Sequence, residues 1–268
     1  ASEFRQKCRN YAATQVSNQR EDFERMGVLG DWENPYLTMD FSFEANIVRT
    51  LGKIIDNGHL KQGFKPVHWC LDCGSALAEA EVEYQDKVSS AIDVAFPFAN
   101  QSEAAALLGV QGAEELSVAI WTTTPWTIPS NKAVVYGSDF SYGLYELTGR
   151  PEECWARIGE RYILADKLAA DVLGRARLDE TMYRRLGDVD PSVISGLKHP
   201  LHGAEGGNGE WDDIRDFRAA DFVTDEEGTG FVHCAPSHGM EEYELYRDLG
   251  MLAQVITYNV MDDGSFRA

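Results

Sequence analysis

The chain has 268 residues, of which 44% are hydrophobic and 25% charged, values typical of a soluble globular protein with room for a large core. Acidic side chains outnumber basic ones by 44 to 24, which gives a formal net charge of −20. An electrostatic field of that sign repels polyanions, so strong nucleic-acid binding by this chain alone is excluded.

Targeting and cysteine patterns point to the cytoplasm. No apolar stretch approaches the roughly 18 residues of a membrane span, and the first residues, ASEFRQKCRN, lack the hydrophobic region of a signal peptide. The five cysteines are odd in number and mostly isolated, which argues against a secreted disulfide framework. We therefore expect a cytoplasmic protein with no membrane partner.

Two amphipathic helices are predicted first. Apolar residues recur at steps of three and four over residues 3–26, and Gly27 follows as a stop. A second apolar stripe covers residues 43–57 and ends before Gly58. Neither helix looks self-sufficient, so we expect both to pack against a partner domain.

Short strands follow from Lys65 onward. They are predicted at residues 66–69, 80–84, 92–98, 117–122, 132–136, 142–147, 161–164, 222–223 and 230–234, with short helices at 102–108, 167–174 and 239–249 and a Gly-rich loop tip at 204–211. Many short strands with irregular connections favour a β-barrel-like α+β domain with short peripheral helices over a regular βαβ winding.

The most informative run is WTTTPWT, residues 121–127. Three adjacent β-branched threonines, Thr122, Thr123 and Thr124, favour extended backbone. Pro125 then removes a backbone donor and ends regular pairing. The run therefore predicts a strand that presents hydroxyls at its end, and a Thr-rich edge strand without function is the alternative.

A second distinctive run, GTGFVHCAPSHGMEEY, covers residues 228–243. Its glycines allow close backbone approach, residues 231–234 read as a buried strand, and a helix begins near Gly239. Carboxylates in a first helical turn are favoured by the helix dipole, so a well-capped helix start explains Glu241 and Glu242. A site for a cationic or ester ligand, formed with His233 and His238, is the other interpretation.

Cys70 and Cys73 form a CxxC knuckle followed by Gly74, as in zinc ribbons. A tetrahedral zinc needs two more ligands, and the chain has no second CxxC. The pattern therefore predicts a zinc half-site, with a metal-free pair as the alternative. The remaining histidines, His59, His199 and His202, have no evident partners in the sequence, and we expect core or solvated roles for them. Walker, GxGxxG and GxSxG motifs are absent.

Taken together, these motifs resemble bacterial isoleucyl-tRNA synthetase. The resemblance rests on WTTTPWTIPSN, GTGFVHCAPSHG, WCLDCGSALAEAEVEY and GDWENPYLTMDFSFEANIVRTLGKIIDNGHL, and it runs over residues 4–266. Valyl- and leucyl-tRNA synthetases share the threonine-rich and GTG motifs, but AEAEVEY and the first 60 residues favour the isoleucyl enzyme. No HIGH-like or KMSKS-like signature is present, so amino-acid activation by this chain is not expected.

The resemblance implies the editing domain of that class I ligase, the connective peptide 1 insertion, with its flanking segments. Residues 1–64 would be a helical arm of the parent catalytic region, 65–90 the CxxC knuckle with connecting strands, and 91–268 the editing domain. The implied enzyme is an aminoacyl-ester hydrolase that removes valine from tRNA(Ile), and valyl-adenylate before transfer. Isoleucyl-tRNA synthetases need this second sieve because one pocket separates isoleucine from valine by only about 150-fold.

The family's pocket can be carried over residue by residue. It implies a threonine wall that holds the terminal adenosine, a histidine that helps to exclude isoleucine, and a carboxylate that binds the amino group. The implied catalytic residues are Thr122, Thr123, Thr124, His233 and Glu242. The implied substrate-binding residues are Trp121, Trp126, Thr127, Asn131, Gly228, Thr229, Gly230 and His238.

Glu242 departs from the family, which carries aspartate at this position. Glutamate keeps the charge but moves the carboxylate by one methylene, and a misplacement of about 1 Å can cost about 100-fold in rate. Either the pocket compensates or editing is weakened, and a non-catalytic aminoacyl-binding or structural module is the alternative function.

The resemblance also implies the partners and cofactors. The partners are the acceptor end of aminoacylated tRNA(Ile) and the remainder of the synthetase, and the chain itself is expected to be monomeric. Editing requires no cofactor. Zinc at Cys70 and Cys73 belongs to the full-length parent, whose matching CxxC would lie beyond residue 268.

Overall fold

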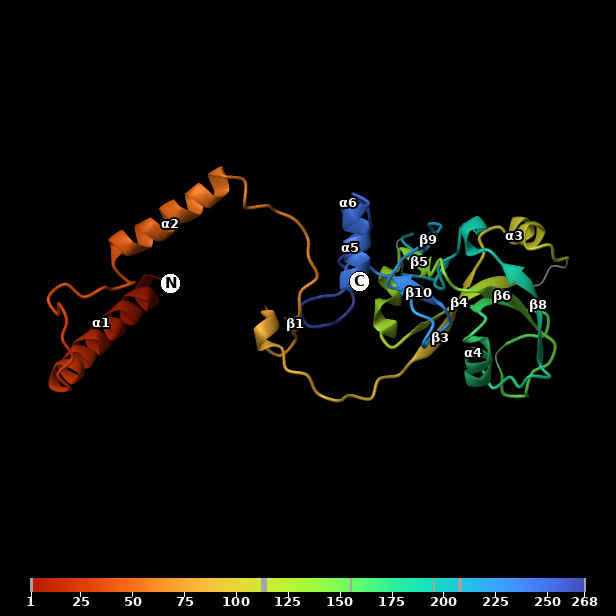
Figure 1. Ribbon diagram of the computed structural model, residues 1–268, viewed down its shortest axis with the longest axis horizontal. Helices are drawn as coiled ribbons and strands as arrows, with labels where there is room; N and C mark the ends of the chain where they lie inside the picture. Colours follow the sequence, from red (N-terminus) through yellow and green to blue (C-terminus); the bar gives the residue numbers. More distant parts are fainter. Residues whose placement is uncertain (1, 112–114, 155, 195, 207–208, 268) are drawn as a thin grey trace. The chain divides into compact units, whose positions relative to one another are not determined.

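The computed structural model describes residues 2–111, 115–154, 156–194, 196–206 and 209–267 (Figure 1). The chain divides into two compact units, Ala1–Gly63 and Phe64–Ala268, so the CxxC segment belongs to the second unit. Among the described helices, none combines the length and apolar character that crossing a bilayer requires.

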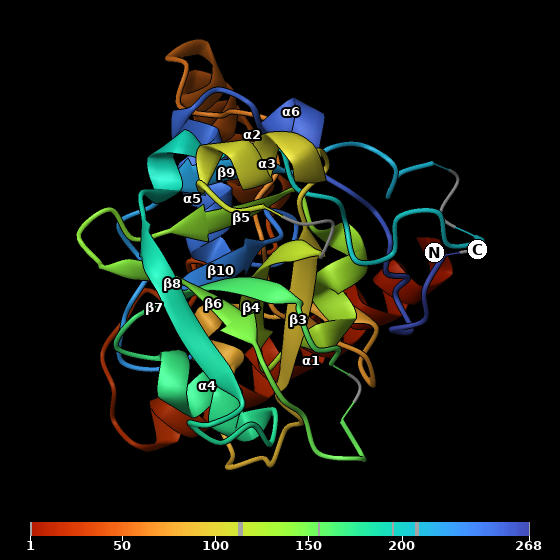
Figure 2. The same cartoon turned by 90° about the vertical axis from the view of Figure 1, so that its right-hand side faces the viewer.

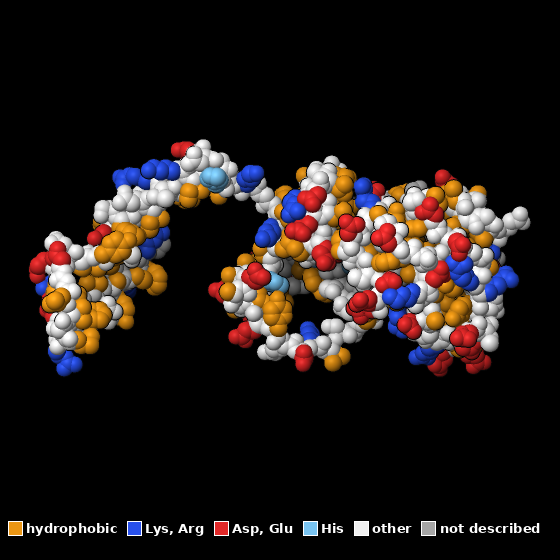
Figure 3. Space-filling model, in the orientation of Figure 1, with side chains coloured by type: hydrophobic (Ala, Val, Ile, Leu, Met, Phe, Trp, Pro, Cys, Tyr) orange, Lys and Arg blue, Asp and Glu red, His pale blue; other side chains and the backbone are white. Residues whose placement is uncertain are grey.

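The first unit consists of two helices, α1 (Ser2–Arg25) and α2 (Phe41–Asp56), as the periodicity predicts. The Arg9 guanidinium joins them, because it donates to Met39 O at 2.6 Å and to Glu44 Oε1 at 2.7 Å. Neither helix buries a residue, and the apolar stripe of α2 stays 43–68% exposed. Figure 3 shows hydrophobic side chains gathered along these helices. This unit has no core of its own.

The second unit contains two larger mixed sheets and a hairpin (Figures 1 and 2). The five-stranded sheet has the order β3 (Ile92–Pro97), β4 (Leu116–Thr122), β7 (Arg161–Ala165), β6 (Tyr142–Leu147) and β8 (Tyr183–Val189). The three-stranded sheet has the order β10 (Phe231–Cys234), β5 (Ala133–Tyr136) and β9 (Asp216–Ala219). The pairs β4–β7 and β5–β9 are parallel and the other pairs antiparallel. β1 (Trp69–Cys70) and β2 (Ser75–Ala76) form the hairpin.

These sheets correct the expected barrel. β10 packs against β4, but the two larger sheets stay separate in the hydrogen-bonding ladders of the described residues. A proline lies at or after the end of three strands: Pro97 ends β3, Pro125 follows β4 and Pro236 follows β10. Proline donates no backbone hydrogen bond, although Phe98, which follows Pro97, still donates to Leu116 O and bridges to Leu197. The unit is a mixed α/β structure with open sheets.

Most predicted elements are present, and the exceptions have identifiable causes. The helices at 102–108, 167–174 and 239–249 correspond to α3 (Gln101–Leu107), α4 (Ala169–Arg175) and α5 (Met240–Asp248). The predicted strand at 80–84 is wrong, because a 3₁₀ turn, η1 (Glu79–Glu81), begins there. The predicted strand at 222–223 is wrong too, because Phe222 lies in a turn and Val223 in irregular backbone. Of the predicted strand at 66–69, only Trp69 lies in a strand. The strands β8 and β9 and the helix α6 (Leu252–Val255) were not predicted.

The missed strands are the polar ones. β8 reads YRRLGDV and β9 reads DFRA, and their side chains are largely exposed or half-buried, so neither shows a clean apolar alternation. Of the predicted loop tip at 204–211, residues 207–208 lie outside the described residues, and the others lie in turns or irregular backbone.

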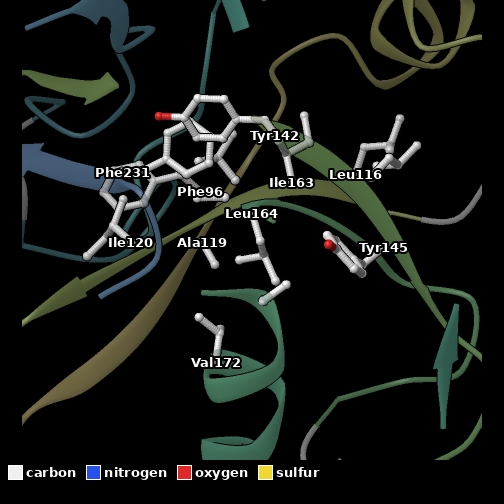
Figure 4. Close-up of a cluster of buried hydrophobic side chains, with 14 of the residues drawn as sticks. Phe96, Leu116, Ala119, Ile120, Tyr142, Tyr145, Ile163, Leu164, Val172 and Phe231 are labelled. Carbon is white, nitrogen blue, oxygen red and sulfur yellow. The ribbon is translucent and has the colours of Figure 1, made fainter. Parts of the chain in front are cut away.

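The main core lies between the five-stranded sheet and β10 and continues under α4. Phe96, Ile120, Tyr142 and Phe231 interlock on one face, and Val172 of α4 approaches the opposite face (Figure 4). The Tyr142 hydroxyl donates to Gly230 O at 2.8 Å, which ties the start of β10 to β6. A smaller core joins β5, β10, α5 and α6. The two cores bring the end of β4, strand β10 and the start of α5 together.

Candidate functional site

A cavity of about 820 Å³ lies in the second unit where these elements meet. Its lining comes from the end of β4, the 3₁₀ segment η2 (Pro125–Ser130), β10, the start of α5, and two stretches at residues 66–71 and 260–264. Of the residues predicted from the sequence, the cavity brings together Trp121, Thr122, Thr124, Trp126, Thr127, His233, His238 and Glu242.

The threonine wall forms as its sequence predicts. β4 ends at Thr122 and η2 begins at Pro125. The Thr122 Oγ1 atom accepts a hydrogen bond from the Thr124 backbone N at 3.0 Å, which fixes the turn. Thr124 lines the cavity, and its hydroxyl has no hydrogen-bond partner in the described part of the chain. Thr123 is exposed and does not line the cavity.

His233 is held in one neutral tautomer. Its Nδ1 atom lies 3.4 Å from the Asn131 side-chain nitrogen, which must donate because it also donates to Ala133 O at 2.7 Å. Nε2 therefore carries the proton and donates to Thr127 Oγ1 at 2.8 Å, and the Thr127 hydroxyl donates in turn to Thr124 O. Burial lowers the pKa of His233 to about 4. Both ring nitrogens are engaged, so this imidazole orients the wall and is poorly placed to accept a further proton.

Glu242 lies at the amino end of α5 and lines the cavity. Its carboxylate folds back over Gly239, where an added Cβ would overlap the Glu242 oxygens. Burial raises the pKa of this carboxyl group, partly offset by a hydrogen bond from its own backbone N–H. It has no ion-pair partner among the described residues. The site thus presents a half-buried carboxyl group that has no ion-pair partner among the described residues.

His238 and Trp126 form the rim beside Glu242. Their rings meet edge to face with centroids 5.0 Å apart, and His238 Nε2 lies 3.1 Å from Ser130 Oγ. Burial lowers the pKa of His238, so this side chain is neutral near pH 7. Trp126 is 49% exposed, which leaves an aromatic face for a ligand at the cavity mouth.

Five predicted residues lie outside the lining: Thr123, Asn131, Gly228, Thr229 and Gly230. Gly228 packs against Trp121, since an added Cβ would lie 3.6 Å from the indole. Gly230 has a φ of +83°, and a Cβ there would overlap Ala165. The GTG backbone therefore seats β10 and Trp121 from behind the cavity.

One wall of the cavity was not predicted. The stretch 66–71 contributes Pro66, Val67, His68, Trp69 and Leu71, and the stretch 260–264 contributes Val260, Met261, Asp262 and Gly264. The Trp69 indole N–H donates to Asp262 O at 2.8 Å, and Leu71 packs on Gly264. These contacts join segments about 190 residues apart, so no local sequence pattern predicts them. Val232, Ala235, Ser237 and Gly239 also line the cavity and adjoin predicted residues.

The hairpin β1–β2 carries both CxxC thiols at its turn. Cys73 N donates to Cys70 Sγ at 3.3 Å, and Gly74 takes a φ of +59°. The contact between the thiols lowers the pKa of Cys70 and raises that of Cys73. Among the described residues, no cluster of three or more His, Cys, Asp or Glu side chains is placed to hold a metal ion. Two thiols supply half of a tetrahedral zinc donor set.

Comparison with known proteins places this chain. The model for class I tRNA synthetases (I, L, M and V) matches residues 1–246. The chain belongs to this family. It is 67% identical over 266 residues to the isoleucine–tRNA ligase of Ruegeria pomeroyi, and 46% identical over 271 residues to that of Alcanivorax borkumensis. These matches cover 99% and 100% of the chain but 26% of each ligase, so this synthetase segment spans about a quarter of its relatives.

Solved structures related to the synthetase segment are more distant. The editing domain of Plasmodium falciparum cytosolic leucyl-tRNA synthetase is 8% identical, with a TM-score of 0.47 over 65% of this chain and 71% of that one. The crystal structure of GlLeuRS-CP1 is 15% identical, with a TM-score of 0.45 over 62% of this chain and 64% of that one.

Proposed function

We propose that this segment of a class I synthetase hydrolyses valyl esters of tRNA(Ile), and valyl-adenylate, as an editing domain, without activating amino acids itself. The observation that carries the proposal is the position of Glu242: a half-buried carboxylate with no ion-pair partner among the described residues lines the same cavity as the threonine wall. Such an arrangement fits the ammonium and the ester of one aminoacyl group.

The ammonium is the complement that Glu242 lacks. Burying an unpaired carboxylate is unfavourable, and here that cost raises the pKa of the group. A ligand ammonium offsets the cost by ion pairing, and the amino end of α5 holds the carboxylate in place. Because Gly239 leaves room for the side chain to fold back, the extra methylene of glutamate relative to aspartate can be accommodated. This is how the cavity would compensate for the family difference.

The hydroxyls and the histidine divide the remaining tasks. The free hydroxyl of Thr124, with Thr122 beside it, orients the ester and the attacking water. His233 is fixed by its two hydrogen bonds and limits the room for the amino-acid side chain, which favours valine over isoleucine. Trp126 offers its exposed face to the terminal adenosine.

The reaction needs no covalent enzyme intermediate. The water oxygen bonds to the ester carbonyl carbon, the bond to the ribose oxygen breaks, and that oxygen leaves with a proton as a hydroxyl. An α-ammonium ester is already activated, so orientation and stabilisation of the developing oxyanion are the contributions that the cavity supplies. We assign no general base to the protein, because both nitrogens of His233 are engaged.

The partners follow from the same proposal. With a net charge of −20, the chain would receive only the acceptor end of the tRNA, while the rest of the synthetase binds its body. The segment would act in the cytoplasm and would not associate with a second copy of itself. Editing would need no cofactor, and Cys70 and Cys73 would complete a zinc site only with two further ligands from the parent enzyme.

The test is deacylation of valyl-tRNA(Ile) by this chain and by two variants, each with one glutamate changed in the first turn of α5. We expect Glu242→Gln to lower kcat/KM by about 100-fold, because it removes the charge but keeps the shape. Glu241→Gln is the matched control: it removes the same charge from the same turn, and Glu241 is exposed and outside the cavity. Equal rates for both variants would contradict the assignment of Glu242.

A non-catalytic aminoacyl-binding module is the second candidate, and the departure at Glu242 favours it. It predicts that a non-hydrolysable valyl-adenosine amide binds the chain and that Glu242→Gln weakens this binding, while valyl-tRNA(Ile) is deacylated only at the uncatalysed rate. Deacylation well above that rate, lost in Glu242→Gln, excludes this module.

A further inference from the structure

The 3₁₀ segment η2 is held from behind by side chains that the editing chemistry does not use. η2 carries Trp126 and Thr127 on its cavity side. A 3₁₀ turn is weak by itself, and two prolines, Pro125 and Pro129, leave it fewer backbone donors. At its two ends, Thr127 N donates to Thr124 O and Asn131 N donates to Ile128 O. The segment therefore needs outside support to keep its shape.

That support comes from residues far along the chain. His199 Nε2 lies 2.8 Å from Ile128 O, and the Trp211 indole N–H donates to Pro129 O at 3.1 Å. Asn259 adds a longer contact of 3.4 Å to the same Pro129 carbonyl. The rings of His199 and Trp211 stack, with centroids 6.0 Å apart and planes within 10°. The stacked rings of His199 and Trp211 thus form hydrogen bonds with two consecutive carbonyls of η2. We call this pair of hydrogen bonds the grip on η2.

His199 is held in the tautomer that can donate to η2. Leu201 N donates to Nδ1 at 3.0 Å, so Nε2 carries the proton and donates to Ile128 O. The side chain is 1% exposed and packs edge to face on Phe96 of β3. The grip is therefore anchored to the main sheet.

We propose that His199 and Trp211 are positioning residues of the editing cavity: they hold η2 so that Thr127 and, through it, His233 keep the cavity at the size that admits valine. The path is continuous, because Ile128 and Pro129 follow Thr127 directly and Thr127 Oγ1 accepts from His233 Nε2. Neither residue lines the cavity, so both act through η2. The effect on valine selection rests on the proposed editing function. The support of η2 rests on these contacts alone.

The variants separate the hydrogen bonds from the packing. His199→Leu removes the donor to Ile128 O and keeps an apolar side chain, whereas His199→Gln retains an N–H₂ donor near the position of Nε2. Trp211→Phe removes only the donor to Pro129 O and keeps a stacked ring. Leu178→Ala is the matched control, because Leu178 is buried in the main core away from η2 and its loss destabilises the fold without touching the grip.

The first measurement is native-state hydrogen exchange, which needs no activity. We expect the amides of Thr127 and Asn131 to exchange about tenfold faster in His199→Leu relative to the amide of Leu144 in β6, the size expected for one lost hydrogen bond. Trp211→Phe should do the same, and His199→Gln should restore protection. Leu178→Ala should leave the ratio unchanged. An unchanged ratio in His199→Leu and Trp211→Phe overturns the grip.

The second measurement is the ratio of kcat/KM for valyl-tRNA(Ile) and isoleucyl-tRNA(Ile). This ratio does not depend on the folded fraction, so loss of stability alone cannot change it. We expect it to fall about tenfold in His199→Leu and to be restored in His199→Gln. Faster exchange of η2 with an unchanged ratio would overturn the positioning role. If the parent chain hydrolyses neither ester, the proposed function fails, and hydrogen exchange still decides the grip.

Discussion

The cavity has two walls of different construction. The threonine wall, made of β4, η2 and β10, is tied by hydrogen bonds from side chains distant in sequence, including those of His199, Trp211 and His233. The hairpin wall, made of residues 66–71 and 260–264, is joined by the Trp69 bond to Asp262 O and by Leu71 on Gly264. The hydrogen bonds of the threonine wall fix the positions of its side chains. The hairpin wall covers the other side of the cavity with fewer contacts.

This difference implies a division of labour. Under the proposed editing function, discrimination by one methylene group, worth about 1–3 kcal/mol, requires a rigid wall, and we assign that role to the threonine wall. The hairpin wall, with Trp69 41% exposed, is joined by a single indole hydrogen bond and one packing contact. Substitutions in the threonine wall should therefore cost more stability and more selectivity than substitutions in the hairpin wall.

The largest effect is expected from a comparison of two glycines, Gly230 behind the threonine wall and Gly264 in the hairpin wall. Gly230→Ala places a Cβ against Ala165 at a φ of +83°, so strain and overlap add to about 4 kcal/mol of lost stability. Gly264→Ala has a similar φ of +82° but meets only the flexible end of Leu71, at 3.1 Å, and should cost about 1–2 kcal/mol. Urea denaturation measures both. Equal losses of unfolding free energy in the two variants would contradict the proposed difference in rigidity between the walls.

The next effect is a loss of stability on acidification. Burial lowers the pKa of His233 to about 4, below its ordinary 6.5, so the unfolded state binds a proton first as pH falls. The stabilising contribution is complete above pH 6.5 and is lost between 6.5 and about 4, at roughly 3 kcal/mol for this histidine.

The comparison that isolates this histidine is the change in unfolding free energy between about pH 7 and about pH 5 in the parent chain and in His233→Gln. Glu242 acts in the opposite direction, because its raised pKa favours the folded state as pH falls, and it is common to both proteins. A smaller loss in His233→Gln is expected. Identical pH profiles would show that His233 titrates normally.

An intermediate effect is expected at Thr127, which joins η2 to β10. Thr127→Val keeps the shape but removes the acceptor for His233 and the donor to Thr124 O, and we expect a loss of about 2 kcal/mol. Thr123→Val is the control, because Thr123 is exposed and outside the cavity. Thermal unfolding of the two variants distinguishes them, and a loss no greater than that of Thr123→Val would mean that the hydroxyl of Thr127 is dispensable.

The smallest effect is expected in the hairpin wall. Trp69→Phe removes the bond to Asp262 O at a partly exposed site and should cost about 1 kcal/mol or less. The ratio of valyl- to isoleucyl-ester hydrolysis should stay within about twofold of the parent. A change in that ratio as large as the one expected for His199→Leu would place side-chain selection in the hairpin wall as well.

Much of the fold was readable because its signals are local. Helices α1, α2 and α5 follow the apolar periodicity, and β4 stops at the threonines before Pro125 as predicted. The β-barrel-like architecture, the strand at 222–223 and the polar strands β8 and β9 were misjudged or missed. In these cases strand pairing, and not side-chain alternation, decides the structure, because an edge strand such as β8 needs few buried residues.

The candidate site divides in the same way. The runs at 121–131 and 228–243 pointed to the eight cavity residues because each run is contiguous and chemically distinctive. The GTG residues were expected to pass close to the ligand but lie outside the cavity lining, where the positive φ values of Gly228 and Gly230 and their lack of a Cβ allow close packing on Trp121 and Ala165. His199 was assigned no site role, since its partners Ile128 and Trp211 lie 71 and 12 positions away.

The sequence by itself determined the family, the amphipathic helices, the strand that ends in hydroxyls and the acid at the start of α5. Each depends on local spacing or on chemistry carried by neighbouring residues. Only the tertiary structure decided that the sheets stay open, that the CxxC hairpin closes one side of the cavity, and that η2 is gripped by His199 and Trp211. Those features arise from contacts between distant segments, whose geometry the packing of the two cores sets.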